Sequence, residues 1–139
     1  MIKHLSDKEA RALLDECHTG RLGCIDEGGP YVVPVNYILH GDSIYVHSLP
    51  GRKINALREN PRACLQVDKS ESEYHWRSAI AFGRYEEITD EGDRQWAIRR
   101  VLSRSPGLTP VESVQISEEQ SQVIVFRIHI DEVTGVAEM

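Results

Sequence analysis

The segment Ile44–Asp68 constrains the fold most, because two strand patterns flank one short helical pattern within it. Ile44–Ser48 combines β-branched and aromatic residues in the way that is typical of a half-buried strand. Pro50-Gly51 breaks that strand, and two apolar residues three positions apart then mark one face of a short helix. Asn60-Pro61 ends the helix, because the residue before a proline is pushed out of the α region. The pattern therefore predicts strand, tight loop, short helix and strand.

Two cations open this predicted helix, where the positive end of the helix macrodipole disfavours them by roughly 0.3–1 kcal/mol each. Arg52 and Lys53 have no carboxylate three or four residues away to offset that cost. A bound anion would make the two cations stabilising instead of destabilising. A phosphate could be held here by the free backbone N–H groups, both cations and the Ser48 hydroxyl. The alternative is that both side chains extend into water. The residues themselves leave the two interpretations open.

The rest of the chain reads as turn-linked strands with a helix at each side. Ser6 and Glu9 have the spacing of a capping box for a helix to about Cys17, and Thr89 or Asp90 begins a helix to about Arg104 that buries Trp96 or Ala97, Val101 and Leu102. The predicted strands, besides Ile44–Ser48, are Gly20–Asp26, Tyr31–His40, a strand from Arg62, Tyr74–Ile88 and Gln122–Ile130.

Short turns make the first three strands an antiparallel meander, and Glu27-Gly28-Gly29-Pro30 is the first of these turns. Pro34 cannot donate to a strand ladder, so its strand lies at an edge or carries a bulge, and Gly83 marks a bulge or bend. The remaining segments are expected to be a loop at Lys69–Glu73, a loop at Ser105–Ser121 with a helical turn near Ser117–Gln120, and a tail at Asp131–Met139. Six antiparallel strands with few helices predict a small barrel, since closure removes exposed edges.

Composition narrows the class of protein. At 139 residues we expect one domain spanning residues 1–139. A formal charge of −6 argues against general binding to nucleic acid or anionic membranes, which need a broad basic surface. The N-terminal residues lack the apolar core of a signal peptide and no apolar run reaches membrane-spanning length, so we expect a cytoplasmic protein.

Familiar catalytic motifs do not occur. The three cysteines form no Cys-x-x-Cys pair, and the six histidines form no His-x-x-x-His or HExxH motif, so no metal site is predicted. No Gly-x-Ser-x-Gly elbow marks a nucleophile. His47 precedes the predicted phosphate loop, and Trp76 and Ser78 share one face of a strand. A lone strand histidine is usually structural, and core packing is the default interpretation of Trp76 and Ser78; the functional alternative for these two is an aromatic wall with one hydroxyl.

The order of several motifs resembles the pyridoxamine phosphate oxidase-like flavin-binding split barrels, and within them the nitroimidazole-resistance-like branch. The segments that carry the resemblance are Gly20–Gly23, Pro30–Tyr37, Ile44–Ile54, Asn60–Asp68, Trp76–Arg84 and Ile130–Gly135. The resemblance implies a mainly β fold with flanking helices, a six-stranded antiparallel split β-barrel that binds FMN. It also implies a homodimer with the cofactor at the subunit interface.

Carried onto this chain, the resemblance implies that Arg52 and Lys53 grip the FMN phosphate, with His47 and Ser48 just before them. The flavin ring would be lined by Val35, Asn36 and Tyr37, partly through their backbone groups, with Trp76 and Ser78 near the ring or the ribityl chain. No catalytic residue is assigned, although Tyr37 and His47 are the best candidates for proton transfer.

The function implied is an FMN-dependent oxidoreductase acting on a small electron acceptor such as a nitroaromatic compound. The alternative is a non-catalytic flavin- or haem-binding or storage protein of the same fold. For haem, His47 or His75 would be the candidate axial ligand.

Overall fold

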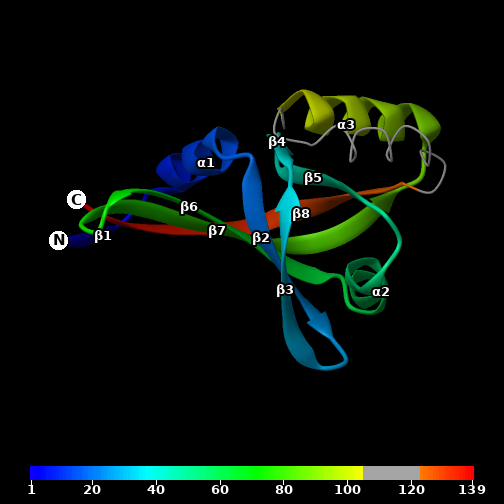
Figure 1. Cartoon of the computed structure of the whole chain (residues 1–139), viewed down its shortest axis with the longest axis horizontal. Coiled ribbons are helices and arrows are strands. Elements are labelled where there is room, and N and C mark those ends of the chain that lie inside the picture. The colour runs from blue at the N-terminus through cyan, green and yellow to red at the C-terminus, as the bar shows by residue number, and fades with distance from the viewer. Residues whose placement is uncertain (105–122) are drawn as a thin grey trace.

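The structure is a computed structural model in which residues 1–104 and 123–139 are described. Figure 1 shows long strands running across the molecule, with α1 and α3 on one side of them and α2 on the other, and the two termini close together at one end. In chain order the elements are β1 (Ile2–His4), α1 (Asp7–Glu16), β2 (Thr19–Asp26), β3 (Gly29–Asn36), β4 (Ile38–His40), β5 (Ser43–Ser48), α2 (Arg52–Glu59), β6 (Arg62–Ser72), β7 (His75–Ile88), α3 (Glu91–Arg104) and β8 (Ile124–Glu138).

The strands form one antiparallel sheet in the order β3-β2-β6-β7-β8-β5-β4, with β1 paired to β8. The predicted single strand Tyr31–His40 is wrong in one respect: it breaks at Tyr37 into β3 and β4. Tyr37 turns into the core, where its backbone N–H bonds to the His18 carbonyl and its hydroxyl donates to the Leu14 carbonyl at 2.6 Å. Because β3 and β4 stand at opposite ends of the strand order, this break joins the two ends of the sheet. Counted with β3 and β4 as one strand and β1 apart, the six predicted strands are confirmed.

Local signals in the sequence explain most element boundaries. Ser6 and Glu9 form the predicted reciprocal capping box at the start of α1. Glu27 and Gly28 both have positive φ, which matches the twist of a two-residue hairpin turn between β2 and β3. Pro34 lies on β3 at the sheet edge, as its missing N–H requires. The predicted bulge at Gly83 is also present: the register shifts there, and a Cβ would lie 1.9 Å from the His129 carbonyl oxygen.

Two predicted irregular segments are strands. The expected loop at Lys69–Glu73 is mostly the end of β6, which runs to Ser72, and the expected tail at Asp131–Met139 is the second half of β8, paired to both β7 and β1. Lys69–Ser72 is polar and exposed, whereas Asp131–Met139 mixes polar residues with Val133, which packs against the core, and Ala137, which is buried. Their composition therefore resembles that of a loop. The short strand β1 was not predicted. The loop and helical turn expected within 105–121 lie outside the described residues.

Two apolar clusters hold the elements together. The larger one fills the barrel and takes Ile54, Ala56 and Leu57 from α2, and residues of α1 close its other side. The smaller one lies under α3, where Ala97 and Val101 are buried while Trp96 and Leu102 are partly exposed. Asp90 caps α3 by accepting a hydrogen bond from the Asp93 backbone N–H. In the described residues, no helix is both long and apolar enough to cross a membrane.

Candidate functional site

The start of α2 is an electropositive corner of the molecule. β5 ends at Ser48, and the tight turn that follows leads into α2 at Arg52. Gly51 is the N-cap and supplies no side-chain hydrogen bond, and the first turn contains no acidic residue. The backbone N–H groups of this turn therefore lack a side-chain acceptor, and two cationic side chains stand beside them.

Arg52 is already paired. Its Nε donates to Asp26 Oδ2 at 2.5 Å, and its guanidinium carbon lies 4.9 Å from the centroid of the Tyr31 ring. The hydrogen bond that Arg52 donates to the Asp26 carboxylate is the main cause that raises the pKa of Arg52. Both partners come from the β2–β3 hairpin and were not identified from the sequence, since an ion pair between residues 26 positions apart leaves no local spacing signal.

Lys53 differs from its neighbour. Its side chain is half-buried, and burial is the main cause that lowers its pKa. Within residues 1–104 and 123–139, no carboxylate lies at ion-pair distance from its ammonium group. A partly buried, unpaired cation at the positive end of a helix is unfavourable unless an anion accompanies it.

His47 adds a second unsatisfied group near the same corner. Its Nε2 is buried and has no hydrogen-bond partner among the described residues. Burial lowers the pKa of His47, and the nearby charge of Lys53 lowers it further, so the imidazole is neutral at neutral pH. Free helix N–H groups, an unpaired ammonium and an unsatisfied imidazole are the donors that a phosphate group accepts from. This donor set fits the phosphate end of a nucleotide-like cofactor. The predicted fourth member, Ser48, instead donates its hydroxyl to the Leu49 carbonyl.

The three predicted ring-lining residues lie at the other end of β3. Val35 and Tyr37 are buried in the barrel core, and the Asn36 side chain accepts a hydrogen bond from Thr19. Tyr37 is six residues from Tyr31, roughly 20 Å along a strand. The Tyr37 hydroxyl is engaged with α1 and its N–H with His18, so its side chain serves the core.

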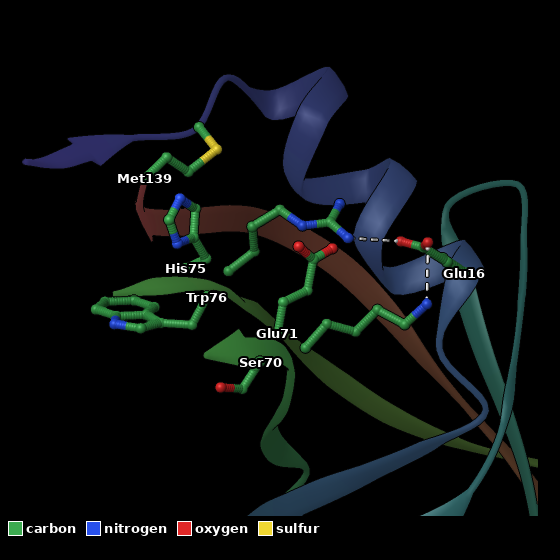
Figure 2. Close-up of a pocket in the computed structure, with 8 residues that line it drawn as sticks. Glu16, Ser70, Glu71, His75, Trp76 and Met139 are labelled. Carbon is green, nitrogen blue, oxygen red and sulfur yellow. Dashed lines mark hydrogen bonds and ion pairs between the residues drawn. The ribbon is translucent and has the colours of Figure 1, made fainter. Parts of the chain in front are cut away.

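Trp76 and Ser78 lie near the start of β7, far from α2 (Figure 1). Trp76 pairs with Ser70, eight residues along β6 from its α2-proximal end, which corresponds to roughly 26 Å. The indole lines a cavity of about 250 Å³ together with charged side chains from α1, β6 and β7. Figure 2 shows Glu16 bridging two cations there, Lys69 Nζ at 3.0 Å and Arg77 at 3.2 Å. Ser78 accepts a hydrogen bond from the Gln66 side chain at 3.1 Å.

Of the nine residues predicted for the site, the structure therefore gathers four around the β5–α2 connection: His47, Ser48, Arg52 and Lys53. The other five form two separate groups on the same chain. In the part of the chain that is described, no three histidine, cysteine or carboxylate side chains come together as a metal site.

Solved structures with this fold include flavin-binding proteins. An FAD-binding protein of Mesorhizobium loti matches with a TM-score of 0.82 and 31% identity, over 100% of this chain and 99% of that one. A candidate 5-nitroimidazole antibiotic resistance protein of Bacteroides thetaiotaomicron matches at 0.76 and 22% identity, over 99% and 89% of the two chains. An FAD- and haem-binding protein of Mycobacterium smegmatis matches at 0.73 and 21% identity, over 98% and 73%.

The family follows from the sequence comparison. The model of the pyridoxamine 5'-phosphate oxidase family matches residues 6–137, so the chain belongs to that family. An uncharacterized protein of Rhizobium meliloti is 30% identical over 146 aligned positions, covering 96% of this chain and 93% of the relative.

Proposed function

We propose that this protein binds FMN and uses it as an oxidoreductase that passes electrons to a small acceptor such as a nitroaromatic compound. The observation that carries the proposal is the unsatisfied donor set at the start of α2. Lys53 has no carboxylate partner and His47 Nε2 no hydrogen-bond partner among the described residues. The flavin named for the M. loti protein, at 31% identity, supports a flavin as the occupant.

The side chains would divide the work of binding. Lys53 and the first-turn N–H groups of α2 would hold the phosphate, with His47 as a neutral hydrogen-bonding neighbour. When bound, the flavin supplies the hydride and electron transfer itself, and the protein positions and shields it. The Tyr37 hydroxyl is committed to the Leu14 carbonyl, which leaves His47 as the better candidate to hold or move a proton.

We further propose that the cofactor site is completed by a second copy of the chain. Within one chain, β6 runs roughly 26 Å from Arg62, which follows α2, to Ser70, which pairs with Trp76, and this length exceeds that of an FMN molecule. If Lys53 and Trp76 both contact one flavin, they come from different subunits of a homodimer. One face of the sheet also has an exposed apolar row suited to such contact. The row crosses four neighbouring strands in the order Val32, Gly23, Cys64 and Phe82, and its two end residues are exposed.

Mixed dimers test this arrangement. Lys53→Met and Trp76→Ala homodimers should each retain little FMN, whereas a mixed dimer carries one intact site and should retain about half of the wild-type amount. Equal loss in the mixed dimer and in the two homodimers would exclude a site shared in this way.

Turnover distinguishes the oxidoreductase from a non-catalytic flavin carrier. FMN-loaded protein is mixed anaerobically with a nicotinamide reductant or dithionite, and reoxidation by a nitroaromatic compound or a quinone is followed by flavin absorbance. Multiple turnovers that exceed the rate of free FMN support the enzyme. Bound flavin that no acceptor reoxidises faster than free flavin assigns the protein to binding or storage.

A further inference from the structure

The ion pair between Asp26 and Arg52 bears on which phosphate the proposed site prefers, and the inference rests on that proposed site. Two consecutive cations begin α2, yet only one is unpaired. Arg52 is bonded through Nε to Asp26 at 2.5 Å, whereas Lys53 has no carboxylate partner in the described chain. The Asp26 side chain is only 15% exposed, and the ion pair holds it beside the start of α2.

The charges at this corner can be counted. Arg52 and Lys53 contribute two positive charges and the ion-paired Asp26 one negative charge, and the exposed Glu27 carboxylate adds a weaker negative influence on Arg52. A phosphate monoester such as that of FMN carries about −1.5 to −2 at pH 7, because its second pKa is about 6. Each phosphate within a pyrophosphate diester carries a single charge. The corner therefore carries at most one net positive charge, which falls short of balancing a doubly charged phosphate.

We infer that Asp26 is a specificity-determining residue that weakens binding of a doubly charged phosphate monoester relative to a singly charged phosphate. Its carboxylate occupies the Arg52 Nε and repels the second negative charge of the incoming group. Removing the Asp26 charge while keeping its shape raises the net charge of the corner by one unit. Affinity for FMN then increases, whereas affinity for riboflavin, which has no phosphate, does not.

A different role for Asp26 predicts the opposite change in FMN affinity. If Asp26 served mainly to orient Arg52 toward the phosphate, neutralising it would loosen Arg52 and weaken FMN binding. Asp26→Asn separates the two roles, because asparagine still offers an oxygen to the Arg52 Nε and loses only the charge. Glu27→Gln is the matched control: it removes the same charge one residue along the chain, from an exposed side chain that makes no ion pair with Arg52 in the described structure.

The experiment is a fluorescence titration of flavin-free, full-length protein with FMN and with riboflavin at pH 8 and about 0.15 M salt, which screens exposed charges. One charge removed from near the phosphate is expected to tighten FMN binding by roughly tenfold in Asp26→Asn. Riboflavin binding should change less than about twofold, and Glu27→Gln should shift FMN binding by less than about threefold. Repeating the FMN titration at pH 5, where the monoester is mostly singly charged, should shrink the Asp26→Asn gain to about threefold or less.

The outcomes separate this inference from the proposed function. Wild-type protein that binds neither FMN nor riboflavin would overturn the proposed function, and the inference with it. Wild-type protein that binds flavin, with Asp26→Asn binding FMN equally or more weakly, would overturn the inference alone. An equal gain for riboflavin and FMN would also overturn it, because the effect would then not act through the phosphate.

Discussion

Replacing Lys53 by methionine should separate the stability of the fold from its capacity to hold a phosphate. Methionine keeps the apolar stem and removes the charge. In the free protein that charge is half-buried, unpaired among the described residues and placed at the positive end of α2. Its removal should stabilise the flavin-free fold by about 0.3–1 kcal/mol from the helix macrodipole alone, which raises Tm by roughly 1–3 °C. Loss of a hydrogen bond to a charged phosphate should cost about 1.5–3 kcal/mol, or roughly 10- to 150-fold in Kd for FMN.

The sign of the pH dependence follows from the same residue. Burial lowers the pKa of Lys53 below its ordinary value of 10.5, so the unfolded chain holds that proton more tightly than the folded chain does. The resulting destabilisation is fully present at neutral pH and is relieved as pH rises through the folded pKa toward 10.5. Lys53→Met should remove this part of the pH dependence.

The assay is urea unfolding of flavin-free protein together with FMN and riboflavin titrations. Lys8→Met is the matched control, because Lys8 is an exposed lysine on α1 and is not among the residues that line the Trp76 cavity. The control should leave FMN binding by the α2 corner unchanged. If Lys53→Met destabilised the free protein by more than about 1 kcal/mol and left FMN binding intact, the assignment of Lys53 to an anion site would be refuted.

Three further substitutions test the fold and its titrating groups. Tyr37→Phe should lower the free energy of unfolding by about 1–3 kcal/mol, because it leaves a carbonyl of α1 without its buried hydrogen-bond donor. An unchanged midpoint of urea unfolding would show that this hydrogen bond contributes nothing. His47→Gln should reduce the loss of stability that the wild-type protein shows below pH 6.5. Burial lowers the pKa of His47 in the folded state, so the unfolded chain takes up the proton first and the free energy of unfolding falls as pH drops. Identical pH profiles of stability for the two proteins would contradict this account. Gly83→Ala should destabilise the fold by at least about 3 kcal/mol or abolish folding, since its Cβ would lie 1.9 Å from the His129 carbonyl oxygen. Gly28→Ala is the control with the milder expected effect, because the space around Gly28 is open. Equal destabilisation by the two substitutions would refute the clash at Gly83.

The sequence predicted the fold well where boundary signals are local. Ser6 and Glu9 specify a cap by their spacing alone, and Asn60-Pro61 ends α2 at the expected residue. Gly83 marked the bulge because few other residues tolerate so close a backbone approach. These signals lie within a few residues of their effects, which is why a single sequence reveals them.

The misses have a common physical origin in long-range contacts. The second half of β8 mixes charged residues and a glycine with its apolar residues, and its partners in β7 and β1 are what make it a strand. The break at Tyr37 depends on a hydrogen bond to a carbonyl in α1. At the site, Arg52 and Lys53 look equivalent in sequence, and only the hairpin that brings Asp26 beside Arg52 distinguishes them.

The central claim is that the α2 corner holds the phosphate of a flavin, and the visible absorption spectrum of purified, untagged protein tests it most directly. The spectrum is recorded before and after incubation with FMN and desalting, alongside an identical preparation incubated with riboflavin. The account predicts a two-band flavin spectrum retained after FMN and largely lost after riboflavin. Retention of both flavins alike would contradict a phosphate site, and a sharp Soret band in place of the flavin bands would move the assignment to haem and to the histidines.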